Sequence, residues 1–222
     1  MRGYVALLHG LGRSSASMTY AEYRVRRAGL TPVNIAYPSR REPLEALARH
    51  VAERLPADAS LPLHFLTHSM GGIVLRLLAR SYRPGNLGRA VMLGPPNQGS
   101  QLASGIRNTW ISRWFLGPAA QEIGHLPGSV PNQIGPVDFE VGVIAGRSSF
   151  DPLRIFVAGE SDGRVSLQET KVEGMTDWIS VKRSHALLMV DPSVFDQALH
   201  FIEHGGFRRP SGAADRNQPG ER

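Results

Sequence analysis

The sequence predicts an α/β protein, a three-layer α/β/α sandwich around a mostly parallel sheet of about six strands. Two observations predict this class. Short apolar runs recur along the chain, as expected for strands that are buried on both faces of a sheet. Segments with helical periodicity separate these runs, and this alternation gives right-handed crossovers between parallel strands.

Six segments carry the strand signal. The first, "YVALLH" at 4–9, is a continuous apolar run that ends at Gly10, where a turn can begin. The others repeat this pattern of a short apolar run close to turn residues. In chain order the predicted strands are 4–9, 32–37, 63–68, 89–94, 141–146 and 178–182.

Most of the predicted helices have a local signal at their start. Ser14 or Ser15 can cap the first helix, and Pro43 suits the first position of the second. Asp191, which a proline follows, can cap the last helix. The predicted helices run from Ser14 or Ser15 to about Arg27, with Gly29 as the stop, from about Glu42 to Leu55, over about 70–82, and from Asp191 onward. Their predicted buried faces are Leu44, Leu47, Ala48, Val51 and Leu55 in the second helix, and Phe195, Ala198, Leu199 and Ile202 in the last.

The alternation of strands and helices is interrupted by an insertion at about 97–136. An insertion at this point would sit above the carboxyl ends of the strands, where open sheets bind ligands. One of its helical faces is unusually bulky, with Trp110, Trp114 and Phe115. We expect these side chains either to line a substrate pocket beneath a cap or to pack as ordinary core.

Composition limits the classes of protein that this chain can represent. Its 222 residues, 41% of them hydrophobic, can bury one substantial core, which predicts a single domain over 1–207. Residues 208–222 have no apolar periodicity and are predicted to form a disordered tail. Because the chain contains no cysteine, disulfides, a thiolate nucleophile and a cysteine-ligated metal are excluded.

The formal net charge of +6 by itself permits binding to nucleic acid or to an anionic membrane. The arginines, however, occur singly or in pairs, so we interpret them as a solvated basic surface and predict no nucleic-acid partner. No apolar stretch reaches the roughly 18 residues that a membrane span needs. The start of the chain has the pattern of a strand and not of a signal peptide, which predicts a cytoplasmic location.

A candidate nucleophile lies in "FLTHSMGG" at 65–72. Ser69 follows a predicted buried strand and precedes "IVLRLLARSY", an amphipathic helix, which is the setting of the G-x-S-x-G turn that presents a nucleophilic serine. Gly71 and Gly72 supply the small residues that so tight a turn needs. Thr67 stands in place of the first glycine. Since β-branching is favoured in strands, we expect the turn to form with some loss of tightness.

A serine nucleophile needs a base, and His185 directly follows the last predicted strand, which carries it to the same sheet edge as Ser69. The segment "GESDGRVS" places Asp162 on a glycine-flanked loop, where it can hold the imidazole tautomer. Asp151 is the rival for this role, because it lies closer to the strand at 141–146.

Backbone amides near the first strand can complete such a site. In "LHGLG", at 8–12, the chain turns at a His-Gly pair where a strand ends. The N–H groups of Leu11 and Met70 are the nearest candidates to stabilise an oxyanion, each being worth about 3 kcal/mol in related systems.

Together these segments resemble the alpha/beta-hydrolase family, and in particular the small bacterial members of its lipase and esterase branch. The matching segments are "LLHGLGRS", "THSMGG", "GPPNQGS", "SDGRVS" and the turn at His185, and they extend from about Tyr4 to Gly206. The resemblance implies a catalytic triad of Ser69, Asp162 and His185, with Leu11 and Met70 as oxyanion amides. The chain departs from the family pattern at Thr67 and by beginning at the strand before the oxyanion turn. The second departure implies a minimal sheet of about six strands.

The predicted function is therefore a serine hydrolase of carboxylic esters that forms an acyl-enzyme on Ser69. The expected substrate is a small acyl ester or a lipid, and no metal or organic cofactor is required. Two alternatives stay open at this point. A thioesterase or acyltransferase would use the same triad, and a non-catalytic binding module would keep only the fold.

Overall fold

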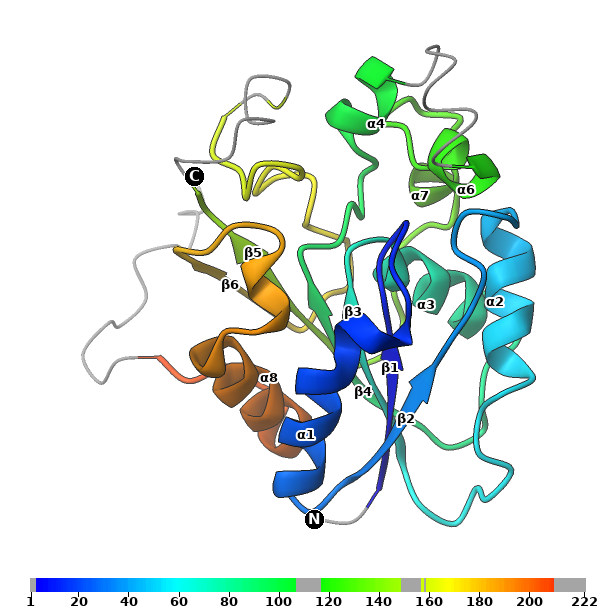
Figure 1. Ribbon diagram of the computed structural model, residues 1–222, viewed down its shortest axis with the longest axis vertical. Helices are drawn as coiled ribbons and strands as arrows, with labels where there is room; N and C mark the ends of the chain where they lie inside the picture. Colours follow the sequence, from blue (N-terminus) through cyan, green and yellow to red (C-terminus); the bar gives the residue numbers. More distant parts are fainter. Residues whose placement is uncertain (1–2, 107–116, 149–156, 158, 210–222) are drawn as a thin grey trace, which may run out of the picture.

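A computed structural model describes residues 3–106, 117–148, 157 and 159–209 of the chain. Its centre is a six-stranded sheet in the order β2-β1-β3-β4-β5-β6, and all neighbouring strands are parallel (Figure 1). The strands are β1 (Tyr4–Leu8), β2 (Thr31–Ile35), β3 (Leu63–His68), β4 (Leu87–Leu93), β5 (Val141–Gly146) and β6 (Asp177–Val181). The six predicted strands and the prediction of a mostly parallel sheet are confirmed, with bounds that differ by at most two residues.

Helices cover both faces of this sheet, which confirms the three-layer prediction (Figure 1). Helices α1 and α8 lie on one face, and α2 and α3 lie on the other. The helices of these layers are α1 (Thr19–Arg27), α2 (Leu44–Ala52), α3 (Met70–Ser81) and α8 (Pro192–His204). Two 3₁₀ helices precede α1 and α8, namely η1 (Ser15–Met18) and η3 (Leu187–Met189).

The side chains of strand β1 contribute to two hydrophobic cores, one on each face of the sheet. Its residues alternate between the faces, so that Val5 and Leu7 pack with α1 and α8 while Ala6 and Leu8 pack with α2 and α3. All four side chains are fully buried. A continuous apolar run is therefore required here, because both faces of the strand are covered. The predicted buried faces of α2 and α8 join these two cores, with Leu55 and Leu199 at their partly buried margins.

The helix starts differ in part from the predictions. Asp191 caps α8 as expected, since its carboxylate accepts hydrogen bonds from the N–H groups of Ser193 and Val194. Ser14 does not cap a helix with its side chain. Instead the chain first forms η1, because the hydroxyl of Ser17 donates to the Ser14 carbonyl at 2.7 Å and competes with a regular α-helical start.

Helix α2 begins one residue later than its proline suggested. Pro43 occupies the N-cap position in an extended conformation and not the first helical position. The partner for the helix start comes from elsewhere in the chain, since the Leu44 N–H donates to the carboxylate of Glu122 at 2.7 Å. An acidic group at a helix start also complements the helix dipole.

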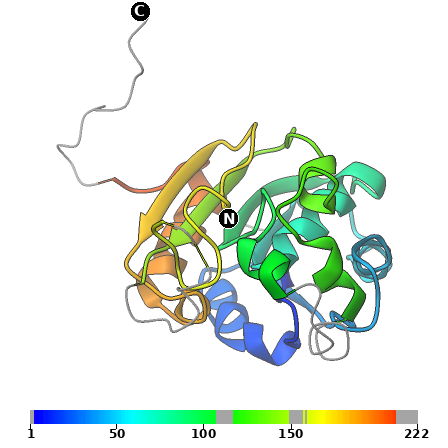
Figure 2. The ribbon, with the colours of Figure 1, turned by 90° about the horizontal axis from the view of Figure 1, so that it is seen from above.

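In the described part of the segment between β4 and β5, three short helices lie at the end of the sheet where the strands have their carboxyl ends (Figure 1). They are α4 (Gln101–Ile106), α6 (Gly117–Glu122) and α7 (Val130–Gln133). Seen from above, they lie toward the side of the molecule that carries α2 and α3 (Figure 2). Within the described ranges, no helix has the length and apolar character needed to cross a membrane.

A buried arginine fastens this segment to α3. Arg76 is only 3% exposed, and its guanidinium donates to the backbone carbonyls of Asn97 (2.8 Å), Pro131 (2.9 Å) and Gly135 (2.8 Å). Burial lowers its pKa to about 10, so it stays charged at neutral pH. Helix α3, which was predicted as an amphipathic helix, is consequently buried on all sides from Met70 to Ala79.

Candidate active site

Ser69 lies at the strained turn between β3 and α3. Its backbone has φ 54° and ψ −125°, and no other non-glycine residue in the described part of the chain has a positive φ. Such a conformation costs of order 1–3 kcal/mol and persists only where surrounding contacts enforce it. Here the Ser69 N–H donates to the Leu93 carbonyl at 2.8 Å, and the buried strand β3 fixes the residues before the turn. The serine is partly exposed at the carboxyl edge of the sheet.

The turn depends on small residues around Ser69. A Cβ on Gly71 would lie 2.6 Å from the Leu8 carbonyl oxygen, and one on Gly72 would lie 2.9 Å from Pro95. A Cβ on Gly10 would approach that of Ser69 to 3.1 Å. Gly71 and Gly72 are therefore needed where the sequence predicted small residues, and Gly10 is a third such position. Thr67, by contrast, is fully buried in β3, and the turn forms without a glycine at this position.

His185 and Asp162 form a buried pair beside this turn. His185 Nδ1 lies 2.6 Å from Asp162 Oδ2, and the two residues are 4% and 0% exposed. The other carboxylate oxygen, Oδ1, accepts hydrogen bonds from the N–H groups of Arg164 and Val165, both at 2.9 Å. The Asp162 carboxylate is thus held by three donors, and its bond to Nδ1 leaves Nε2 of His185 available to accept a proton.

Gly94 makes room for this pair at the end of β4. It has φ +54°, and a Cβ there would lie 3.0 Å from Asp162 Oδ2 and 3.2 Å from His185 Nδ1. The structure therefore brings Asp162 and His185 together, as the sequence suggested. Asp151, the rival acid, lies outside the described residues.

His68 connects the loop that carries His185 to the turn at Ser69. The sequence did not single out this residue. Its Nε2–H donates to the His185 carbonyl at 3.0 Å, and the two imidazole rings lie 4.6 Å apart. Burial, and then the nearby His185, hold the pKa of His68 well below its usual range, so it stays neutral. The available signal was its position directly before Ser69, which places it at the same sheet edge as His185.

The loop after β2 holds the turn at 9–13, which contains Leu11. The hydroxyl of Tyr37 donates to the His9 carbonyl, and the rings of these two residues stack at 4.0 Å. The hydroxyl of Ser39 accepts from the Gly12 N–H at 3.1 Å and donates to the Arg13 carbonyl at 3.4 Å. This turn is therefore fixed from outside by side chains that the sequence reasoning did not single out.

The two predicted oxyanion amides lie on neighbouring elements. Leu11 belongs to the fixed turn that follows β1, and β1 pairs directly with β3. Met70 is the first residue of α3, so its N–H is among those that a helix leaves without an internal partner. Amides of this kind can stabilise negative charge on an oxygen placed between them.

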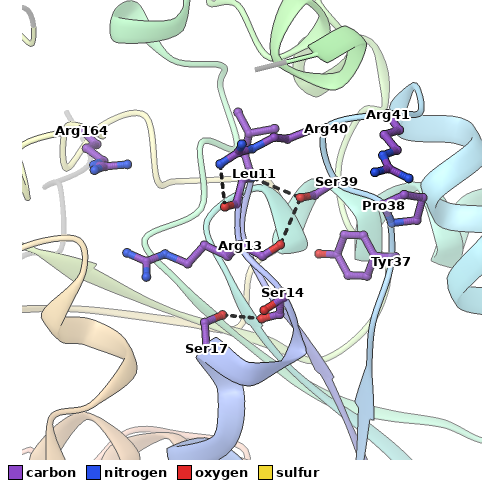
Figure 3. A pocket seen from close by; sticks show the side chains of 11 residues that line it. Leu11, Arg13, Ser14, Ser17, Tyr37, Pro38, Ser39, Arg40, Arg41 and Arg164 are labelled. Atoms are coloured by element: carbon purple, nitrogen blue, oxygen red, sulfur yellow. Dashed lines mark hydrogen bonds between the residues drawn. The ribbon is translucent and has the colours of Figure 1, made fainter. Parts of the chain in front are cut away.

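A cavity of about 640 Å³ opens beside the turn that contains Leu11 (Figure 3). It is lined by the turn itself, by Ser14 and Ser17 after the turn, by the loop after β2, and by Arg164. The predicted pocket residues Trp110, Trp114 and Phe115 lie outside the described residues.

Comparison with known proteins extends the description. No family model and no curated protein matches the chain. Among solved structures, the mature lipase BlEst2 of Bacillus licheniformis is similar with a TM-score of 0.67 and 17% identity, over 84% of this chain and 86% of that one. The metagenomic carboxyl esterase MGS0156 has a TM-score of 0.63 and 16% identity, over 82% of this chain and 64% of its own.

A third solved structure matches over most of both chains. An extracellular alpha/beta-hydrolase from a Paenibacillus species has a TM-score of 0.58 and 13% identity, over 90% of this chain and 98% of that one. The all-parallel sheet with helices on both faces and the likeness to these three structures agree with the resemblance seen in the sequence motifs. The chain has the alpha/beta-hydrolase fold.

Proposed function

We propose that this protein is a serine hydrolase of carboxylic esters. The observation that carries the proposal is the buried contact between His185 Nδ1 and Asp162 Oδ2 at 2.6 Å, which lies at the sheet edge where Ser69 sits in a strained turn. A nucleophile, a base and an acid that orients the base are the three groups that acyl transfer requires. The likeness to a lipase and an esterase supports the same reaction class.

The proposed reaction has two steps. Ser69 Oγ attacks the ester carbonyl while His185 Nε2 takes its proton, and the resulting oxyanion receives hydrogen bonds from the N–H groups of Leu11 and Met70. His185 then gives the proton to the leaving alcohol, which leaves an acyl group on Ser69. A water molecule, deprotonated by the same histidine, releases the acid and restores the serine. No cofactor takes part.

The substrate is proposed to be a small acyl ester or a lipid, and the cytoplasm stays the predicted location. Trp110, Trp114 and Phe115 are proposed to contact the acyl chain, because each CH₂ that they bury is worth roughly 0.8 kcal/mol. This contribution predicts that kcat/KM rises with acyl-chain length over a series of p-nitrophenyl esters, until the pocket is filled.

Initial rates on p-nitrophenyl esters test the proposal. Ser69→Ala should lower kcat by on the order of 10⁴-fold or more with little change in the free energy of unfolding, because the residue is partly exposed. Ser81→Ala is the matched control, since Ser81 is an exposed serine at the other end of α3. Wild-type rates in purified Ser69→Ala would exclude Ser69 as the nucleophile.

A further inference from the structure

The cavity beside the turn at 9–13 has an unusual charge distribution. Eleven residues line it, and four of them are arginines, namely Arg13, Arg40, Arg41 and Arg164. No carboxylate is among these lining residues. Its volume of about 640 Å³ falls within the roughly 300–1,000 Å³ range of small-molecule sites.

Among the residues that the structure describes, the cavity arginines have no acidic partner. Many other arginines pair with carboxylates, as Arg24 does with Asp196 and Arg83 with Asp138, both at 2.6 Å. Within the described ranges, none of the four cavity arginines forms an ion pair. Four like charges that share one concavity repel each other, and a bound anion relieves this repulsion.

The arginines come from three separate segments, and two of these segments carry proposed catalytic groups, namely Leu11 and Asp162. Arg40 lies against the turn, where its Nη2 donates to the Gly12 carbonyl at 3.2 Å. Arg164 lies two residues after Asp162, and its backbone N–H donates to Asp162 Oδ1. In Figure 3 the side chains of Arg13 and Arg40 extend toward the side of the cavity on which Arg164 lies.

The positive potential of this cluster reaches the serine turn. Burial is the largest cause of the low pKa of His68, but the charges of Arg13 and Arg164 also lower it. Leu11, a proposed oxyanion amide, itself lines the cavity.

We propose that this cavity binds a phosphate group carried by the ester substrate. Phosphate suits the site because it has up to two negative charges and several acceptor oxygens, and guanidinium groups bind such oxygens in bidentate pairs. The exposed hydroxyl of Ser14, which also lines the cavity, is a further donor. The proposal rests on the ester hydrolase function proposed above and adds the chemical class of the substrate.

A matched pair of esters tests this specificity. We expect wild-type kcat/KM at low ionic strength to be about tenfold higher for 1-hexanoyl-glycerol 3-phosphate than for 1-hexanoyl-glycerol, since hydrogen bonds to charged groups are the stronger ones. The double variant Arg13→Gln/Arg164→Gln should lose most of this ratio. Added salt should lower the ratio in the wild type and have little effect on it in the double variant.

Arg26→Gln/Arg54→Gln is the matched control, because it removes the same charge from exposed arginines outside the cavity. This control should keep the wild-type ratio. Equal kcat/KM for the two esters in the wild type, or the same loss of ratio in both double variants, would overturn the phosphate proposal.

A binding measurement separates this proposal from the hydrolase function. Calorimetry with glycerol 3-phosphate on Ser69→Ala needs no turnover, and we expect binding that Arg13→Gln/Arg164→Gln weakens about tenfold. Binding without hydrolysis of any ester would refute the hydrolase function and leave the phosphate site. Ester hydrolysis with no preference for the phosphate ester and no binding of glycerol 3-phosphate would refute the phosphate site and leave the hydrolase function.

The source of the phosphate can be a soluble ester or a lipid headgroup. Monomeric 1-hexanoyl-glycerol 3-phosphate represents the first source, and phosphatidylcholine vesicles with or without phosphatidic acid represent the second. A preference in the monomeric arm indicates a soluble ester. Faster hydrolysis only in the vesicles that contain phosphatidic acid, again lost in Arg13→Gln/Arg164→Gln, indicates a headgroup.

Discussion

At the scale of single residues, the Asp162 carboxylate is held in one orientation by its surroundings. Oδ1 accepts from two backbone N–H groups, and Oδ2 accepts from His185 Nδ1. Both oxygens must therefore be acceptors. A side chain with one oxygen and one NH₂ group cannot satisfy both sets of donors.

Asp162→Asn should therefore disable the site while keeping its shape. With its oxygen on the backbone N–H groups, the asparagine turns its NH₂ toward Nδ1, which favours the tautomer with a proton on Nε2. That tautomer cannot accept the serine proton, so kcat/KM for p-nitrophenyl butyrate near neutral pH should fall by about 10⁴-fold. Asp151→Asn is the comparison variant and should stay near the wild-type value. The reverse pattern would transfer the acid role to Asp151.

Only some residues of the candidate site could be predicted from the sequence. Ser69 and His185 could be predicted as candidates, because each directly follows a strand and parallel strands end at one edge. His68 was missed, since its position before Ser69 was the only signal and its contact with His185 joins positions far apart in the chain. The arginines of the cavity were predicted to be a dispersed, solvated surface for the same reason. They line one cavity only because folding brings together the loop after β1, the loop after β2 and the loop that carries Asp162.

At the scale of elements, strands were predicted more accurately than helix starts. Continuous apolar runs encode burial on both faces, and this signal is local to each strand. A helix start can instead be satisfied by a distant group, as Glu122 does for α2. The same holds for Arg76, whose partners are carbonyls of the segment between β4 and β5. An arginine in a helix pattern predicts a polar face, and here that face is covered.

At the scale of the whole molecule, three buried histidines link stability to pH. His9, His64 and His68 are at most 6% exposed, and burial is the largest cause of the lowered pKa of each. His64 must also stay neutral for its contact, because its Nδ1 accepts a hydrogen bond from the Arg89 N–H at 3.0 Å.

The free energy of unfolding should therefore fall as the pH drops below about 6.5, the ordinary pKa of histidine. Below that pH the unfolded chain binds protons that the buried imidazoles of the folded chain do not bind, with a slope of at most about 4 kcal/mol per pH unit for three groups. Urea unfolding between pH 7.5 and pH 5 measures the slope. His64→Asn, whose amide oxygen can still accept from Arg89, should reduce it by about one third. A free energy of unfolding that stays level from pH 7 to pH 5 would contradict burial of these histidines in their neutral form.

The most direct test of the proposed hydrolase is covalent labelling of Ser69 by a fluorophosphonate probe, followed by mass spectrometry of the modified peptide. An activated serine attacks the probe, whereas a serine in a binding module of the same fold does not. We predict stoichiometric labelling of the wild type and of Ser81→Ala at Ser69, labelling slowed by several orders of magnitude in His185→Ala, and none in Ser69→Ala. An unlabelled wild-type protein, or equal labelling of Ser69→Ala, would contradict the assignment of Ser69 as the nucleophile.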